Sequence, residues 1–147
     1  MRLKGLLVPE HLVRLVETGQ WRGWLSAETL ARIAPGMDAR IELCESFDDM
    51  ASNSGMPRRL GRDYVELFHV YLGSQTPAKP LPWMDEEQSL FIAVGDYGDD
   101  TGFALDYRAN AECPRVVGGF WERLPHLACQ WKVVANSFDA FAHVLGF

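Results

Sequence analysis

The sequence predicts an α+β fold, in which N-terminal helices pack on an antiparallel, curved β-sheet that is closed by a C-terminal amphipathic helix. Three observations lead to this prediction. Apolar residues recur at helical spacing in the first part of the chain, four apolar or alternating segments follow residue 89, and a capped amphipathic stripe ends the sequence. The chain has 147 residues, too few for two domains of ordinary size. We therefore expect a single domain over residues 1–147.

Two short helices are predicted near the N-terminus. Leucines recur at helical spacing within residues 9–18, and Gly19 is placed to end that helix. Ser26 is placed to cap a second helix by accepting hydrogen bonds from first-turn amides, and Pro35 ends it. Each helix is expected to bury one apolar stripe and to leave its polar side chains in solvent.

The middle of the chain gives weaker signals. Residues 39–45 alternate as a strand does, and a helix of one to two turns is expected after Ser46, followed by a loop. Residues 62–73 fit a helical face, although their aromatic and β-branched content also fits a strand, and we favour the helix. Three prolines within residues 74–83 indicate an internal linker, because proline cannot serve a central strand.

The second half of the chain predicts the sheet. Residues 90–94 are continuously apolar, as in a strand covered on both faces, and residues 101–107 alternate as a strand with one tightly packed face does. The short connection between them predicts a hairpin, in which Gly95 and Gly98 permit a positive φ. Two further strands are expected, at residues 114–121 and 129–135.

A final amphipathic helix is predicted to close the domain. Its N-terminal cap is either Asn136 with Asp139 three residues on, or Ser137 alone. Phe138 and further apolar residues then lie on one helical stripe, and Gly146 is placed as the stop. We assign Phe138 to the core.

The charge of the chain is unevenly distributed. Its formal net charge is −6, and residues 80–107 contain seven acidic residues and no lysine or arginine. The acidic residues are Asp85, Glu86, Glu87, Asp96, Asp99, Asp100 and Asp106. Such a surface repels phosphate backbones, which disfavours direct nucleic-acid binding, and it attracts a basic partner. The alternative reading is a surface that only keeps the protein soluble.

Composition also limits the compartment and the class of protein. No apolar run approaches the ~20 residues that a membrane span requires, and we recognise no signal peptide. The three cysteines, Cys44, Cys113 and Cys129, form no Cys-x-x-Cys pair, which argues against a zinc ribbon or a thioredoxin-like site. We expect buried or partly buried free thiols in a reducing cytoplasm, and no membrane contact.

Three stretches of the second half follow one another in an order known from one protein family. "LFIAVGDYGDDTGFALDY" has an apolar strand, a glycine-aspartate turn and a second strand; "PRVV" supplies the next strand; and "VVANSFDAFAHVL" has a short polar cap and Ser-Phe at the start of a helix. In this order, the stretches resemble the SUKH superfamily, which is named partly after a fungal cell-wall-synthesis regulator. The similarity extends from Leu90 to Leu145.

The resemblance implies an α+β domain and a binding function. Bacterial members of this superfamily are mostly thought to be immunity proteins that bind and block a toxin made by their own cell, whereas eukaryotic members act in signalling and scaffolding. Since neither role requires catalytic residues, the resemblance transfers no catalytic site and implies no cofactor.

The acidic hairpin also invites a metal or catalytic interpretation, which the spacing disfavours. Asp96, Asp99 and Asp100 offer hard oxygen ligands, but an EF-hand loop needs acids at alternate positions, a glycine at the sixth and a glutamate at the twelfth. Asp106 is the one candidate for a carboxyl with a raised pKa, although an aspartate that closes a strand more often accepts amide hydrogen bonds. None of the four histidines lies in a nucleophile motif, and the sequence contains no glycine-rich phosphate loop. We predict no catalytic, metal or cofactor site.

Aromatic residues complete the predicted binding surface, because protein interfaces favour tryptophan and tyrosine anchors. Trp83 and Trp121 lie in proline-rich and glycine-rich segments, where interface anchoring competes with packing at the sheet edge. The candidate partner-binding residues are Asp85, Glu86, Glu87, Asp96, Tyr97, Asp99, Asp100, Trp83 and Trp121. The sequence favours a non-catalytic immunity protein that blocks a cognate toxin, such as a nuclease or another basic domain. A regulatory adaptor is the alternative, and a small hydrolase is less favoured.

Overall fold

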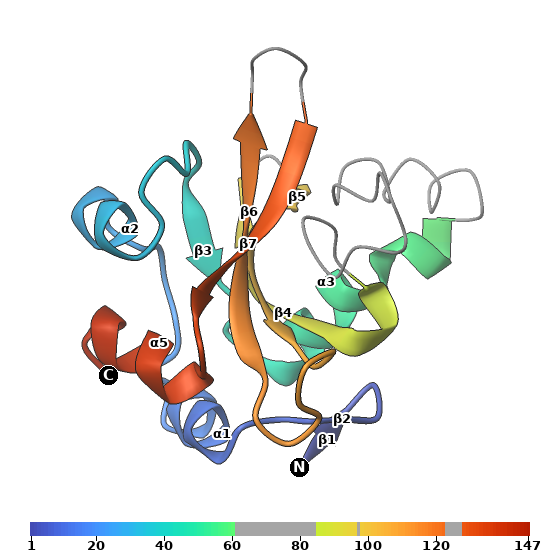
Figure 1. Cartoon of the computed structure of the whole chain (residues 1–147). Helices are drawn as coiled ribbons and strands as arrows, with labels where there is room; N and C mark the ends of the chain where they lie inside the picture. Colours follow the sequence, from blue (N-terminus) through green and yellow to red (C-terminus); the bar gives the residue numbers. More distant parts are fainter. Residues whose placement is uncertain (61–84, 97, 123–127) are drawn as a thin grey trace.

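The computed structural model describes residues 1–60, 85–96, 98–122 and 128–147. These residues build a five-stranded antiparallel sheet with the spatial order β3-β4-β5-β6-β7 (Figure 1). The strands are β3 (Ile41–Leu43), β4 (Ser89–Gly95), β5 (Gly98–Asp106), β6 (Arg115–Glu122) and β7 (Ala128–Ala135). Helices and strands together confirm the predicted α+β class. The helix favoured for residues 62–73 and the linker at 74–83 lie outside the described residues.

Helices flank both sides of this sheet. The described helices are α1 (Glu10–Glu17), α2 (Ala27–Ile33), α3 (Phe47–Leu60), the 3-10 helix η1 (Glu86–Gln88) and α5 (Phe138–Leu145). Figure 1 shows α1, α2 and α5 on one side of the sheet and α3 on the other. None of the helices in the described ranges is both long and apolar enough to span a bilayer.

The main core lies between the sheet and the side that carries α1, α2 and α5. The Trp21 ring packs on Phe138 with 5.4 Å between ring centroids, and Phe103 packs on Phe141 at 5.0 Å. All four aromatic side chains are buried, which confirms the core assignment of Phe138. Removing such a ring leaves a cavity as well as losing its transfer free energy, so these contacts stabilise the fold strongly.

The opposite face of the sheet is buried as well. Ala104 stands beside Phe91 on β4 and Val117 on β6, and all three are buried. The Phe91 ring meets the buried Trp131 of β7 edge-on, with centroids 5.6 Å apart. Every residue of β4 is buried except Val94, which is partly buried, and this confirms the strand covered on both faces that its apolar run predicted.

The helix ends follow the predicted capping residues. Ser26 accepts a hydrogen bond from the Thr29 amide at 3.1 Å, and Ser137 accepts one from the Ala140 amide at 3.2 Å. Ser137 is therefore the cap of α5, which decides between the two predicted caps. Gly19 and Gly146 adopt φ values of 68° and 94°, the left-handed geometry that glycine supplies at a helix C-terminus.

The helix predicted after Ser46 is longer than its one or two expected turns. It is α3, with 14 residues, and it continues past Gly55 and Pro57. Tertiary contacts explain the extension, because Met50 is fully buried and the Ser54 hydroxyl accepts a hydrogen bond from the Phe91 amide of β4 at 2.8 Å. Packing against β4 thus overrides the weak helix propensity of glycine and proline.

The N-terminal residues form a hairpin that the sequence analysis did not predict. Strands β1 (Arg2–Leu3) and β2 (Leu6–Leu7) pair across Lys4 and Gly5, whose φ values of 53° and 83° are typical of a tight two-residue turn. The Tyr107 hydroxyl donates to the Leu7 carbonyl at 2.7 Å and ties the hairpin to the end of β5. Burial raises the pKa of this hydroxyl.

The predicted hairpin between β4 and β5 is confirmed, but its left-handed residue is not Gly95. Gly95 pairs with Gly98, and a Cβ on Gly95 would overlap the Thr101 hydroxyl. Gly102 instead has a φ of 143° and lies against the Ala93 carbonyl. The register shifts in this strand pair place the close backbone approach inside β5 rather than in the turn.

Candidate functional site

The end of the sheet where β3 begins and β4 ends is fixed by two hydrogen bonds between Asp96 and Arg40. The Asp96 amide donates to the Arg40 carbonyl at 3.0 Å, and Asp96 Oδ1 accepts from the Arg40 amide at 3.3 Å. Asp96 is exposed and follows the last residue of β4. One carboxylate of the acidic hairpin is therefore held at a defined place on the sheet rather than on a loose loop.

An exposed tryptophan lies beside this pair. Trp24 is 46% exposed, and the Arg40 guanidinium carbon stands 4.4 Å from the centroid of its ring. Trp24 also forms an isolated antiparallel bridge with Glu42, and the Leu25 amide donates to the Ile41 carbonyl at 2.9 Å. We call Trp24, Arg40 and Asp96 the Trp24 corner.

Sequence reasoning did not select Trp24 as an anchor, although it lies in the motif "WRGW". The two tryptophans of this motif have opposite environments. Trp21 is fully buried and donates from Nε1 to the Ile92 carbonyl at 3.2 Å, whereas Trp24 is turned outward. Gly23 lies between them with a positive φ of 84°, which changes the direction of the chain.

Among the side chains that the structure describes, the acidic residues do not form one continuous surface. Asp85 and Glu87 precede β4, whereas Asp96 follows it, and seven strand residues separate the two groups by about 23 Å. Asp85 caps η1, because its Oδ1 accepts from the Glu87 amide at 3.0 Å and its Oδ2 from Gln88 Nε2 at 2.8 Å. Only the Asp96 end adjoins the Trp24 corner.

The other predicted binding residues are less fully placed. Trp83 and Tyr97 lie outside the described residues. For four more, the structure describes the backbone but not the side chain: Glu86 in η1, Asp99 and Asp100 in β5, and Trp121 in β6. Backbone pairing of Gly95 with Gly98 keeps the start of β5 at the same end of the sheet as the Trp24 corner.

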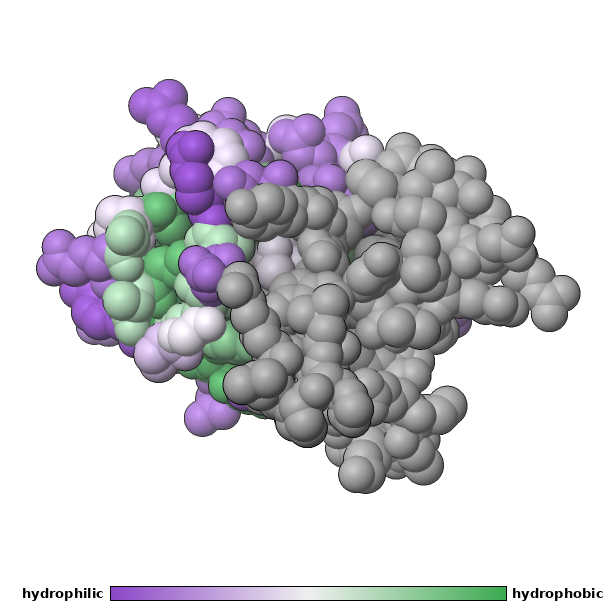
Figure 2. Space-filling view, turned by 90° about the horizontal axis from the view of Figure 1, so that it is seen from above, coloured by the Kyte–Doolittle hydropathy of each residue, from purple (hydrophilic) through white to green (hydrophobic). Residues whose placement is uncertain are grey.

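Figure 2 looks down on this end of the molecule. On its described part, hydrophilic residues form the outer edge beside a smaller hydrophobic area. A polar rim around less polar residues is the usual composition of a non-obligate protein interface.

Asp106 belongs to a buried ion cluster at the opposite end of β5. Its side chain is 1% exposed, and its two oxygens contact Arg108 Nε at 2.7 Å and Arg115 Nη2 at 2.9 Å. The Arg108 amide also donates to Oδ1 at 3.2 Å, which confirms the predicted amide hydrogen bond. We call these three residues the Asp106 cluster.

The electrostatics of the Asp106 cluster keep the carboxylate ionised. Burial on its own raises the pKa of Asp106, but hydrogen bonds and charge from Arg108, together with Arg115, outweigh burial and lower the pKa below its ordinary value of 3.8. A carboxyl with a lowered pKa is a poor proton donor at neutral pH. The cluster therefore joins the end of β5 to the start of β6 and offers no general acid.

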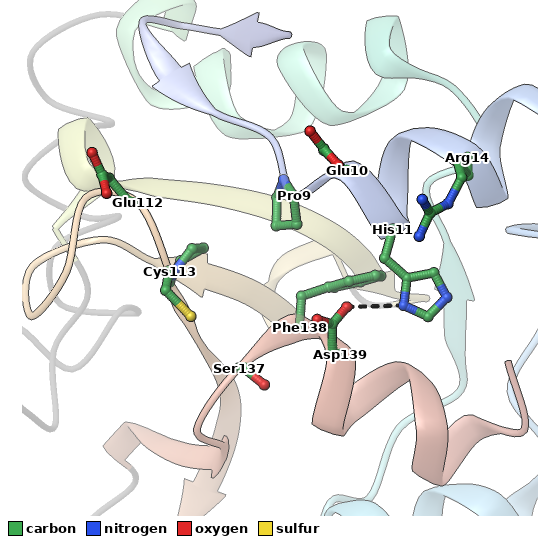
Figure 3. Close-up of a pocket in the computed structure, with 10 residues that line it drawn as sticks. Pro9, Glu10, His11, Arg14, Glu112, Cys113, Ser137, Phe138 and Asp139 are labelled. Atoms are coloured by element: carbon green, nitrogen blue, oxygen red, sulfur yellow. Dashed lines mark hydrogen bonds and ion pairs between the residues drawn. The ribbon is translucent and has the colours of Figure 1, made fainter.

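A cavity of about 260 Å³ opens between α1, α5 and the loop before β6 (Figure 3). Its lining residues are Pro9, Glu10, His11, Arg14, Glu112, Cys113, Pro114, Ser137, Phe138 and Asp139. His11 Nδ1 lies 2.9 Å from Asp139 Oδ1, and the His11 ring meets Phe138 edge-on at 5.8 Å. We call this cavity the His11 pocket.

The His11 pocket contains residue types used in nucleophilic catalysis, but their arrangement does not activate the thiol. Figure 3 shows Cys113 and His11 at opposite sides of the view, with Phe138 and Asp139 between them. A histidine that activates a cysteine must lie within hydrogen-bond reach of the sulfur. Cys113 is exposed, contrary to the burial expected for the thiols, whereas Cys44 is buried. The described ranges contain no set of three His, Cys, Asp or Glu side chains able to hold a metal ion.

In comparisons with known proteins, no family model, no curated protein and no solved structure matched the chain. The resemblance to the SUKH superfamily thus stays a prediction from the residues of the second half. Function has to be argued from the geometry of the Trp24 corner, the Asp106 cluster and the His11 pocket.

Proposed function

We propose that the protein is a cytoplasmic, non-catalytic binding module of the immunity type, which binds a cognate toxin domain and blocks it. The observation that carries this proposal is the Trp24 corner, where a guanidinium lies over an exposed ring and a carboxylate accepts from the backbone amide of the same arginine. Tryptophan is among the residues that most often anchor protein interfaces. The family resemblance supports the same function.

Charge supports a basic partner. The chain carries a formal net charge of −6, and Asp96 lies at the tip of its acidic hairpin. Complementary charge accelerates association with a basic toxin domain and makes the rate sensitive to salt. Hydrogen bonding between Asp96 and Arg40 limits the flexibility of this carboxylate, so little entropy is lost when a partner contacts it.

The test is binding to, and protection from, the toxin encoded beside this protein. We expect the wild-type protein to protect cells and to bind the purified toxin domain, with an association rate that falls as salt rises. Absence of both protection and binding would contradict the proposal. Protection is measured in cells that express the active toxin. Binding is measured with a catalytically inactive toxin domain.

A matched pair of variants localises the interface. Trp24→Leu should weaken toxin binding by about tenfold or more, as expected for an interface anchor. Val144→Ala is the control, because Val144 is also exposed, at 42%, but lies on α5. Equal weakening by both variants would place the interface elsewhere.

One competing function has a specific observation behind it, since His11, Asp139 and Cys113 line the same pocket. Such residue types also occur in small hydrolases. Purified wild-type protein and His11→Ala should be compared on ester and peptide substrates. Turnover that is lost in His11→Ala would assign catalysis to the His11 pocket, whereas equal background rates in both proteins would remove this candidate.

A further inference from the structure

The ring of Trp24 already binds a cation, and that cation comes from the same chain. Arg40 places its guanidinium carbon 4.4 Å from the ring centroid, within the range of a cation–π contact. Trp24 is 46% exposed, and such contacts are weak where water reaches them. In the described residues the Arg40 guanidinium has this ring contact and no ion pair. Its position is therefore weakly held.

Three carboxylates belong to residues that contact the backbone of the segments holding Trp24 and Arg40. Glu42 is the bridge partner of Trp24, Glu45 Oε1 accepts from the Gly23 amide at 3.1 Å, and Asp96 Oδ1 accepts from the Arg40 amide at 3.3 Å. The Glu45 and Asp96 carboxylates are thus each held by a backbone amide next to Trp24 or at Arg40. These three carboxylates outnumber the two guanidinium groups of the same segments, Arg22 and Arg40.

We propose that the Trp24 ring and these carboxylates form a binding site for an arginine side chain of the partner, and that this arginine displaces Arg40. The inference rests on the proposed function, because it names the chemistry of the group that the toxin domain inserts. Arginine fits better than lysine, since a planar guanidinium stacks on an indole ring while it donates to carboxylates at its edge.

Displacement makes Arg40 an internal competitor. An incoming guanidinium must replace that of Arg40 on the ring, and the two groups repel each other while both are present. Removing the Arg40 guanidinium therefore frees the ring face and increases the local negative potential. Removing a nearby arginine that does not contact the ring changes only the potential.

The experiment uses the full chain and three blocked synthetic peptides that alternate serine with arginine, lysine or glutamate. Binding is measured by calorimetry at low salt. We expect the arginine peptide to bind about two- to fivefold more tightly than the lysine peptide, and the glutamate peptide not to bind. Equal affinity for the arginine and lysine peptides would overturn the arginine assignment.

Variants test the ring and the competitor separately. Trp24→Leu should lose the preference for the arginine peptide, and Trp24→Phe should retain part of it, because phenylalanine keeps a ring face. Arg40→Gln should strengthen binding of the arginine peptide more than Arg22→Gln does. Arg22 is the matched control, since it is exposed and removing it changes the charge equally.

Two outcomes would overturn the proposal. Equal effects of Arg40→Gln and Arg22→Gln would show that Arg40 acts through charge alone, and full preference in Trp24→Leu would show that the ring is not the site. Thermal unfolding of each variant confirms that it is folded. Toxin protection is scored separately: if protection fails while the peptides still discriminate, the proposed function falls and the arginine site stands.

Discussion

Acidic and arginine residues lie at both ends of the β4–β5 pair, and the two groups differ in burial. In the Asp106 cluster the carboxylate is 1% exposed and contacts two arginines. In the Trp24 corner Asp96 is exposed, and Arg40 contacts a ring rather than a carboxylate. The same residue types therefore form a closed structural unit at one end and an open surface at the other.

The difference indicates where binding can occur. A buried charge must be compensated inside the protein, so every hydrogen-bonding position of Asp106 serves the fold. At the Trp24 corner Arg40 and Asp96 are exposed to solvent, so a partner can contact them at small structural cost. We expect substitutions in the Asp106 cluster to change stability, and substitutions in the Trp24 corner to change binding.

The largest effect is expected for Asp106→Asn. This change leaves Arg108 and Arg115 without their carboxylate, and breaking a buried ion pair by removing one partner typically costs about 3–5 kcal/mol. Urea unfolding at pH 7 measures the loss. Asp96→Asn is the control and should change the free energy of unfolding by less than about 1 kcal/mol, because Asp96 is exposed.

Acid should remove the same stabilisation gradually. The folded state holds the pKa of Asp106 below its ordinary value of 3.8, so its contribution is complete above that value and is lost as the pH falls through the lower, folded-state pKa. Unfolding free energies measured between pH 6 and pH 2 should therefore fall more steeply for the wild type than for Asp106→Asn. Parallel curves would show that Asp106 does not titrate in this way.

The two arginines of the cluster should contribute unequally. The Arg108 side chain is 10% exposed and donates to both oxygens of Asp106, whereas the Arg115 side chain is 25% exposed and donates to Oδ2. Hydrogen bonds to charged groups contribute about 1.5–3 kcal/mol, and solvent reduces this. We expect Arg108→Ala to destabilise more than Arg115→Ala in urea unfolding, and the reverse order would contradict this assignment.

The smallest effect on stability is expected at the Trp24 corner. An exposed cation–π contact contributes roughly 0.5–1 kcal/mol, so Trp24→Leu and Arg40→Gln should each shift the free energy of unfolding by no more than that. Thermal and urea unfolding provide the measurement. A loss comparable to that of Asp106→Asn would mean that the corner is a structural unit too, and the contrast between the two ends would disappear.

Local signals were sufficient for the helix ends and the strands of the second half. The capping serines and the C-terminal glycines of the helices interact only with neighbouring backbone groups, and such short-range effects can be recognised in sequence. These residues are Ser26, Ser137, Gly19 and Gly146. Contacts between distant segments decided the features that were missed. The length of α3 depends on packing against β4, and the Arg115 contact of Asp106 depends on strand register.

The candidate site was harder to predict than the fold. Seven acidic residues within residues 80–107 suggested one surface, but β4 separates Asp85 from Asp96. Trp24 was not selected, because Trp21 and Trp24 share a motif and only the surrounding fold turns one inward and the other outward. Side-chain exposure is set by tertiary structure, which residue type alone does not determine.

The account depends most on the Trp24 corner being the surface that meets the toxin. The direct measurement compares the affinity of wild-type, Trp24→Leu and Val144→Ala proteins for the inactive toxin domain encoded beside this protein. We predict a loss of about tenfold or more for Trp24→Leu and almost none for Val144→Ala. Unchanged affinity of Trp24→Leu, in a variant that unfolds like the wild type, would contradict the account.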